Sequence, residues 1–197
     1  MLRTLSFDYS TDHTLVVCLV IWQRGAAMNG VDNGQNAKLA LSGLSECDLN
    51  QYVGKDIKEI CDTDYVDPRV NHCAHFVSHV IGLKVGLICG SMKYETRGQG
   101  ASLRVNEIYN SCSSVGDWSS RPESVKHCFI FATLASNVSS RGVMGEHPKK
   151  HIGIFLGGNV WHYSNGGDKV VTDSPQSFLN KFKGVYGQTT ETYYGVL

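Results

Sequence analysis

The sequence predicts an α+β fold in which a helix bearing a cysteine packs on an antiparallel sheet. A helix is indicated over 73–81, because apolar residues at 73, 76, 77, 80 and 81 follow the i, i+3, i+4, i+7, i+8 spacing of one helix face. A strand is indicated over His151–Gly157, where apolar side chains alternate. Helical patterns come before most of the strand patterns along the chain. This order favours an α+β fold with one antiparallel sheet of about four to six strands.

Residues 1–36 are predicted to form an extension with one strand and a loop, ahead of a single domain over 37–197. The strand is the apolar run Leu15–Trp22, whose eight residues fall short of the about 20 that cross a membrane. Acidic residues precede it and no small-residue cleavage pattern follows, which argues against a signal peptide. Residues 28–36 carry turn signals and are predicted to be loop.

The middle of the chain is predicted to hold helices and loops. Apolar residues between Ala37 and Cys61 recur at roughly helical spacing, and Gly82 is expected to end the helix over 73–81. Residues 83–126 are rich in Gly, Ser and Asn around a short helical pattern at 103–109. Loops of this kind commonly carry substrate specificity.

The C-terminal part is predicted to alternate strands and a helix. Gly157–Asn159 has the composition of a hairpin turn, so the strand that follows should return beside the first. Ser174 and Pro175 suit the N-cap and the first position of a helix. The remaining elements are strands at 160–164 and 169–173, a helix at 176–182 and a final strand at 185–194.

Cys73 is the candidate nucleophile because it stands in the first turn of the predicted helix, after Asn71 as N-cap. A cysteine attacks as thiolate, and its usual pKa of about 8.5 leaves little thiolate at neutral pH. Unpaired backbone N–H groups and the helix dipole favour the anion at this position. We therefore predict a lowered pKa for Cys73, with backbone N–H groups available to an oxyanion.

His151 is the candidate general base, and His162 the group that orients it. His151 opens the strand over 151–157, and His162 lies at the centre of the strand that returns after the hairpin. A neutral imidazole must present one particular nitrogen, so a partner has to hold the other. The pairing depends on register, because a slip of one residue would turn His162 to the other face.

Each of these residues also has an ordinary structural interpretation. A single cysteine among apolar neighbours is usually a small buried hydrophobe. Single strand histidines are more often hydrogen-bonded structural residues. Only the combination, in the order Cys73, His151 and His162, favours catalysis.

The motifs carry a family resemblance. They are the helix start Cys73–Val77, the apolar run Cys128–Ala132, the strand His151–Gly157 and the returning segment Trp161–Tyr163. In this order they resemble the NlpC-type cysteine peptidases, a papain-like superfamily of bacterial cell-wall amidases and endopeptidases. The resemblance covers roughly residues 65–165 and implies a papain-like fold.

The resemblance also implies roles for particular residues. Cys73 would be the nucleophile, His151 the general base and His162 the orienting third residue. Tyr65 is the nearby match to a family tyrosine close to the oxyanion site. His75 and Trp161 are predicted to bind substrate.

The expected function is hydrolysis of an amide bond in a peptidoglycan stem peptide through an acyl-enzyme. The expected partners are a peptide or muropeptide substrate and an inhibitor or immunity protein. Synthesis in the cytoplasm and export to the cell wall by a dedicated system are expected. Two alternatives stay open: an acyltransferase or deamidase with the same site, and an inactive papain-like binding module, against which the intact Cys73, His151 and His162 argue.

The charge balance and the cysteine spacing restrict the kinds of partner and cofactor that the sequence predicts. The 18 basic and 18 acidic residues give zero net charge, so no broad field favours nucleic acid or an anionic membrane. The seven cysteines form no CxxC pair, and no cofactor or metal is predicted. His75 and His79 have the i, i+4 spacing of a helical metal pair, but no His-Glu-x-x-His pattern accompanies them. We interpret them as a solvated or cleft-facing helix edge.

Overall fold

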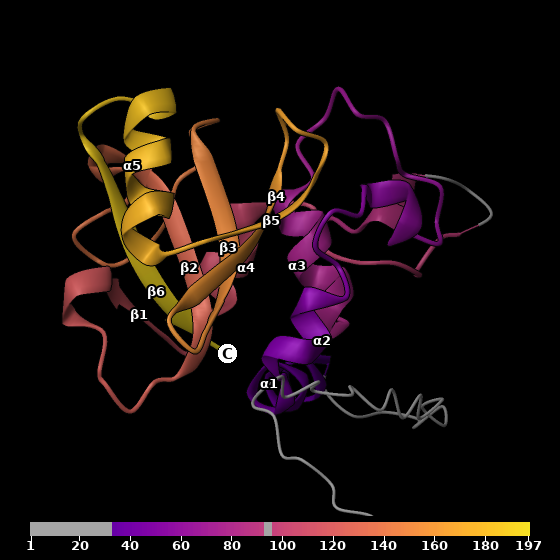
Figure 1. Cartoon of the computed structure of the whole chain (residues 1–197), viewed down its shortest axis with the longest axis horizontal. Helices are drawn as coiled ribbons and strands as arrows, with labels where there is room; N and C mark the ends of the chain where they lie inside the picture. The colour runs from indigo at the N-terminus through magenta and orange to yellow at the C-terminus, as the bar shows by residue number, and fades with distance from the viewer. Residues whose placement is uncertain (1–32, 93–95) are drawn as a thin grey trace, which may run out of the picture.

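A six-stranded antiparallel sheet, in the order β1-β6-β2-β3-β4-β5, forms the centre of the computed structural model (Figure 1). The structure describes residues 33–92 and 96–197, so the strand predicted at 15–22 lies outside the described residues. The strands are β1 (Ser114–Asp117), β2 (His127–Leu134), β3 (Lys150–Leu156), β4 (Asn159–Ser164), β5 (Lys169–Asp173) and β6 (Thr190–Val196). The α+β class and a sheet of up to six strands are confirmed.

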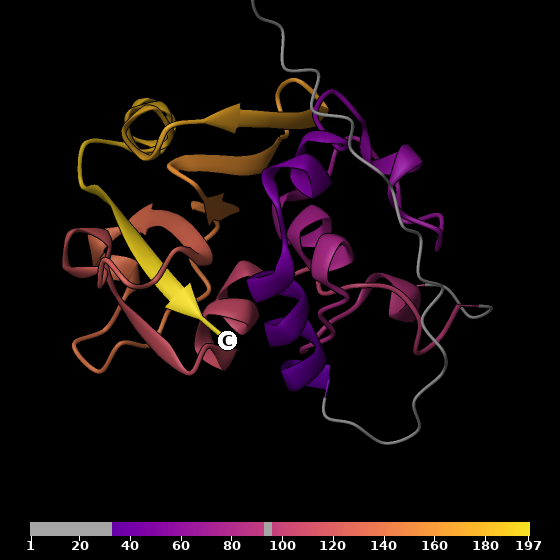
Figure 2. The same cartoon turned by 60° about the horizontal axis from the view of Figure 1, so that its bottom comes forward.

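Helices lie on both faces of this sheet. They are α1 (Asn33–Gly43), α2 (Glu46–Asn50), α3 (Cys73–Ile81), α4 (Val105–Ser111) and α5 (Pro175–Tyr186), with 3-10 turns η1 (Ile57–Glu59), η2 (Cys89–Met92), η3 (Trp118–Ser120) and η4 (Ala135–Asn137). The larger apolar core joins α1, α3 and α4 to one face, and a smaller core joins α5 to the other. Figure 2 shows the indigo-to-magenta helices on one side of the sheet and α5 on the other.

Successive side chains of β3 point alternately into the core that contains α3 and toward α5. Ile152, Ile154 and Leu156 belong to the core that contains α3, so the predicted alternation is confirmed. Phe155 belongs to the core that contains α5, and the ring of His151 stacks on α5 at Phe182, with 4.2 Å between ring centroids. His151 therefore lies on the α5 side of the sheet.

The predicted hairpin between β3 and β4 is confirmed. Leu156 pairs with Asn159, which leaves Gly157 and Gly158 as a two-residue loop. Both have positive φ, at 59° and 94°, which a side chain would strain. This loop sets the register that brings the two strand histidines together.

The predicted helix ends are also found. Gly82 ends α3 in the left-handed conformation, with φ of 67°. Ser174 Oγ accepts a hydrogen bond from Ser177 N at 3.1 Å, and Pro175 is the first residue of α5. The short helix predicted over 103–109 corresponds to α4.

Two boundaries differ from the predictions, and one strand was not predicted. The loop expected over 28–36 is wrong for 33–36, because α1 begins at Asn33 and is held by the buried Ala37 and Leu41. The final strand does not begin at residue 185, because α5 continues to Tyr186, whose ring packs on Phe182. The strand β1 was not predicted; it is a short edge strand whose side chains are at most partly buried.

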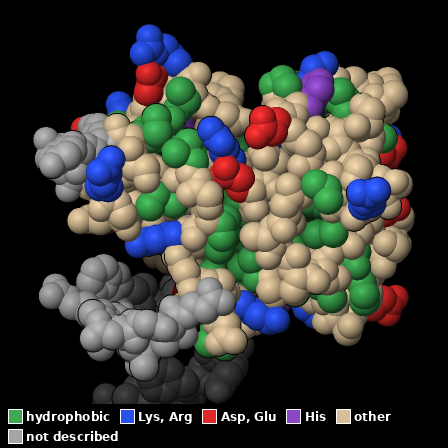
Figure 3. All heavy atoms as spheres, turned by 180° about the vertical axis from the view of Figure 1, so that it is seen from behind, with side chains coloured by type: hydrophobic (Ala, Val, Ile, Leu, Met, Phe, Trp, Pro, Cys, Tyr) green, Lys and Arg blue, Asp and Glu red, His purple; other side chains and the backbone are tan. Residues whose placement is uncertain are grey.

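The face of the molecule seen in Figure 3 agrees with the balanced composition. On the face in Figure 3, basic and acidic side chains are interspersed, with no extended area of one sign. Within residues 33–92 and 96–197, no helix has the length and apolar character needed to cross a membrane.

Candidate functional site

Cys73 stands at the first position of α3, as predicted. The N-cap residue is His72, not Asn71, because α3 begins one residue later than an Asn71 cap requires. Asn71 still serves the helix end, since its Oδ1 accepts the N–H of Cys73 at 2.9 Å. The N–H that we expected to stabilise an oxyanion therefore already has a partner.

The sulfur of Cys73 lies where β3 and β4 separate. The two strands pair only from Ile154 to Leu156, and the backbone N–H of Ile152, beyond that ladder, is close enough to the sulfur to act to lower the thiol pKa. The backbone of Ala74 and the side chain of Asn71 act on the thiol pKa in the same direction. The thiol is thus held beside the residue that follows His151.

The expectation of a lowered thiol pKa is wrong for this conformation. Cys73 is 1% exposed, and its burial raises the pKa to about 12 although the surrounding donors act to lower it. Desolvation outweighs the helix terminus because the thiolate would lose nearly all of its water. Cys73 is a neutral thiol before any reaction begins.

His151 of β3 and His162 of β4 are in contact on the face of the sheet that α5 covers. The Nε2 atom of His151 lies 3.0 Å from Nδ1 of His162, so the register that we predicted from the hairpin is correct. Both side chains are buried, at 1% and 0% exposure. Between the described residues, no hydrogen bond joins the imidazole of His151 to Cys73.

Asp173 extends the pair into a relay of three residues. Its Oδ2 atom lies 2.9 Å from Nε2 of His162 and 2.5 Å from Nζ of Lys181, and its Oδ1 accepts from Ser177 Oγ at 3.0 Å. Sequence reasoning recognised the strand that ends at Asp173 but not this role. The missing signal was the β4–β5 register, in which Val160 pairs with Asp173 and so places the carboxylate diagonally from His162.

The hydrogen bonds of the relay determine which ring nitrogen of each histidine carries the proton. Burial acts to raise the pKa of Asp173, but hydrogen bonds from Lys181, His162 and Ser177 outweigh it and lower the pKa. The ionised carboxylate only accepts, so His162 donates from Nε2 and keeps a lone pair at Nδ1. His151 then donates from Nε2, which leaves Nδ1 as its unprotonated nitrogen.

The Nδ1 atom of His151 is buried and has no hydrogen-bond partner among the described residues. Burial, with His162 and Lys181 nearby, lowers the pKa of His151 well below its usual value, so the ring is neutral. An orphaned buried lone pair is costly in a structural core. In a reaction site the same lone pair is a free general base.

Two cavities adjoin the cysteine and the histidines. Cys73 lines a cavity of 340 Å³. His151 and His162 line a second one of 480 Å³. Asn71 and Pro148 line both cavities, so the two are neighbours.

The other predicted site residues, Tyr65, Trp161 and His75, are not part of the relay. Tyr65 packs its ring against His72 and His75, with centroids 6.1 and 5.7 Å away. Trp161 is 1% exposed in the core and donates its indole N–H to Asn50 Oδ1 at 3.0 Å, so it offers no surface to a substrate here. His75 is fully buried, which corrects its interpretation as a cleft-facing edge.

A second group of side chains could hold a metal ion. The ligand-type atoms of Cys61, His75, His79 and Cys89 all lie within 4.8 Å of one another. The i, i+4 spacing of the two histidines was the only signal for it in the sequence, because the two cysteines come from distant loops.

No family model, curated protein or solved structure is significantly similar to the chain. The chemistry of the site has to be inferred from its own residues.

Proposed function

We propose that this protein is a thiol hydrolase of papain-like arrangement that cleaves an amide bond through an acyl-enzyme. Cys73 is the nucleophile and His151 the general base, and His162 with Asp173 holds the base in its reactive tautomer. The observation that carries the proposal is the buried, unpartnered Nδ1 of His151 at the end of a hydrogen-bonded relay. The resemblance to NlpC-type peptidases supports the same roles for the cysteine and both histidines.

The reaction starts from a neutral pair. Since burial raises the pKa of Cys73 to about 12 and lowers that of His151, the thiol and imidazole do not form a resting ion pair. Cys73 belongs to the core on the α3 side and the His151 ring packs against α5, so the two groups have to meet where β3 and β4 separate. There His151 Nδ1 takes the thiol proton as sulfur attacks the carbonyl, and then returns it to the leaving amine. Water, activated by the same nitrogen, releases the acyl group.

Asn71 is the side chain best suited to stabilise the oxyanion. Its Oδ1 accepts the N–H of Cys73, and its side chain acts to lower the pKa of the thiol, so its amide NH₂ is near the nucleophile. Asn71 also lines both cavities, so the donor stands where a scissile carbonyl would bind. Tyr65, the tyrosine suggested by the family resemblance, packs its ring on His72 and His75, and we propose Asn71 as the principal donor.

The cavity at Cys73 suits a peptide that carries carboxylates. Arg104 and Lys150 line it with a single acidic side chain, Glu146. Two cations in a confined site attract carboxylate groups of a bound peptide. A peptidoglycan stem peptide has such groups, which agrees with the family resemblance, and we propose it as the substrate.

Purified muropeptides test the proposal directly. Wild type should release a new amine at one defined position, detected by mass spectrometry, and Cys73→Ala should release none. Cys128→Ala is the matched control, because Cys128 is equally buried but lies in the core on the α5 side of the sheet. Equal cleavage by wild type and Cys73→Ala would refute the proposal.

A second candidate reaction is acyl transfer to an amine. The cavity beside His151 is walled on one side by Phe182, Val185 and Tyr186 of α5, an apolar surface that can shelter an acceptor from water. Incubation with amine acceptors distinguishes the two reactions, because transfer adds the mass of the acceptor to the product and hydrolysis adds water.

A further inference from the structure

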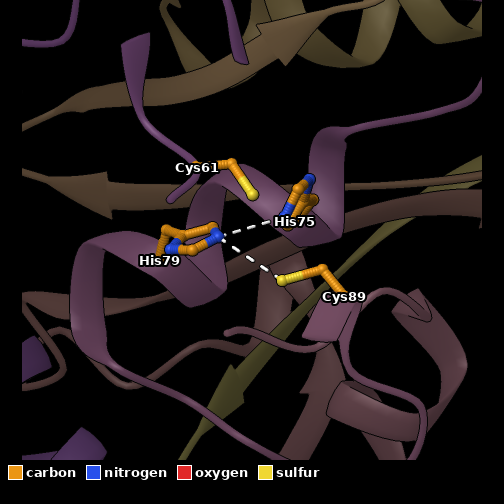
Figure 4. A group of neighbouring side chains, drawn as sticks. All are labelled: Cys61, His75, His79 and Cys89. Carbon is orange, nitrogen blue, oxygen red and sulfur yellow. Dashed lines mark hydrogen bonds between the residues drawn. The ribbon is translucent and has the colours of Figure 1, made fainter. Parts of the chain in front are cut away.

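Four metal-ligand side chains from three separate segments converge beside α3. Cys61 follows η1, His75 and His79 lie one turn apart on α3, and Cys89 begins η2. Figure 4 shows the four side chains directed toward a common centre. None of them belongs to the relay of His151, His162 and Asp173.

The distances within this cluster fit a tetrahedral site. His75 Nε2 lies 3.0 Å from His79 Nε2, and His79 Nε2 lies 3.7 Å from Cys89 Sγ (Figure 4). Ideal bond lengths to zinc, about 2.05 Å for nitrogen and 2.3 Å for sulfur, give tetrahedral edges of about 3.3 to 3.8 Å. Only small side-chain adjustments separate the cluster from that geometry.

Neighbouring groups orient the ligand atom of His75. The carbonyl of Asp67 accepts from His72 Nε2 at 2.9 Å, so His72 Nδ1 is an acceptor. It receives the N–H of His75 Nδ1 at 3.2 Å, and this leaves His75 Nε2 with its lone pair facing the cluster. Protein metal sites commonly fix a histidine ligand through a second hydrogen bond of this kind.

The sulfur atoms are supported as well. The N–H of Ala101 donates to Cys89 Sγ at 3.2 Å, and Thr63 Oγ1 lies 3.2 Å from Cys61 Sγ. Three of the four residues are buried, and His79 is partly buried. Backbone and hydroxyl donors around buried sulfur favour thiolate ligands.

We propose that Cys61, His75, His79 and Cys89 bind one structural zinc ion. Two sulfurs and two imidazoles at tetrahedral spacing are a typical zinc donor set. Four protein ligands leave no position for water or substrate, so the ion would have no direct part in catalysis.

The proposed ion would tie two loop regions to the helix that carries the nucleophile. Cys61 and Cys89 lie in loops with only short 3-10 turns, whereas His75 and His79 are on α3. Cross-linking both loops to α3 would fix the position of Cys73, two residues before His75. This inference is independent of the reaction that Cys73 performs.

Metal content is the direct test. Wild type, prepared under reducing conditions with zinc in the medium, should contain one zinc ion per chain by elemental mass spectrometry. The double variant Cys61→Ser/Cys89→Ser should lose at least about ten-fold in zinc content or affinity. Cys112→Ser and Cys73→Ser, outside the cluster, should keep one ion per chain.

A second measurement uses wild type alone, so it tests the proposal even if the double variant does not fold. Wild type stripped with a chelator and refilled with Co²⁺ should develop visible bands and thiolate-to-cobalt charge transfer characteristic of tetrahedral sulfur–nitrogen coordination. Refilling should also protect the thiols of Cys61 and Cys89 from alkylation, but not that of Cys112.

Three outcomes would overturn the inference. The first is a wild-type protein that contains no zinc and develops no tetrahedral cobalt spectrum. The second is a double variant that keeps its full zinc content. The third is a disulfide between Cys61 and Cys89 in freshly purified protein that has not been reduced. The first would leave a metal-free hydrogen-bonded cluster, and the last a redox cross-link between the two loops.

Discussion

His162 Nε2 lies 2.9 Å from Asp173 Oδ2, and this contact sets the protonation of His151 one ring further along. A carboxylate that only accepts makes each histidine donate in the same direction. The reactive lone pair is therefore positioned by a residue that is two hydrogen bonds removed from it.

Replacement of Asp173 by Asn should remove the fixed direction of the hydrogen bonds from His151 to His162 to residue 173. An amide can donate as well as accept, so His162 loses its preferred tautomer and His151 Nδ1 becomes protonated in part of the population. We expect turnover to fall by about 10- to 10⁴-fold, with little change in KM. Ser177→Ala, which removes a contact to the other carboxylate oxygen, is the control and should stay within a few-fold of wild type in steady-state assays.

Removal of His162 should affect turnover less than removal of the nucleophile. His162→Ala leaves His151 in place but unoriented, and we expect a loss of about 10- to 1000-fold. The control is His127→Ala on β2, whose ring contacts the carbonyl of Leu41 and not the relay. Unchanged turnover in His162→Ala would mean that the relay has no catalytic role.

The thiol of Cys73 should titrate without a low-pKa step. Because burial raises its pKa to about 12, the alkylation rate should rise continuously from about pH 6 to pH 9. The rate is measured by mass spectrometry on the peptide that contains Cys73. A plateau with a midpoint below about pH 7 would instead indicate a resting thiolate–imidazolium pair.

Stability should fall in mild acid. Burial, with His162 and Lys181, lowers the pKa of His151, and burial also lowers that of His162. The unfolded chain then binds protons that the folded chain does not, so this stabilisation is complete above the unfolded pKa of about 6.5 and is lost as the pH falls toward the folded values.

Urea titrations between about pH 5 and pH 8 measure this loss. The slope contributed by His151, whose pKa is lowered well below its usual value, should approach about 1.4 kcal/mol per pH unit below pH 6.5, and His162 should add to it in the same direction. The variant His151→Gln should show a smaller slope than wild type in the same range. Identical slopes would contradict a neutral buried His151.

Phe182 should contribute to stability through its contact with His151. Its ring stacks on the imidazole with 4.2 Å between centroids, and it belongs to the core under α5. Phe182→Ala should lower the free energy of unfolding by about 3 kcal/mol. The exposed neighbour Val185 is the control, since Val185→Ala should change it by less than about 0.5 kcal/mol.

The parts predicted from sequence are those governed by local rules. Gly157 and Gly158 indicated the hairpin, and apolar spacing indicated the helix that begins at Cys73. These signals need only neighbouring residues, so they place Cys73, His151 and His162 on the correct elements. The contact between the two histidines followed from the hairpin register.

The remaining parts depend on contacts between distant segments. Asp173 joins the relay through a four-residue loop whose register no local pattern specifies. Cys61 and Cys89 meet His75 and His79 only after two loops fold onto α3. The raised pKa of Cys73 was not predicted either: burial of this cysteine was one interpretation of the sequence, but only the packed structure shows that desolvation outweighs the helix terminus.

The nine residues of α3 carry the nucleophile at one end and two ligands of the proposed zinc site in its body. An inserted or deleted residue between Cys73 and His75 would rotate one function relative to the other by about 100°. The helical phase between positions 73, 75 and 79 is therefore a shared constraint, and the surrounding loops can change length far more freely than this single helix.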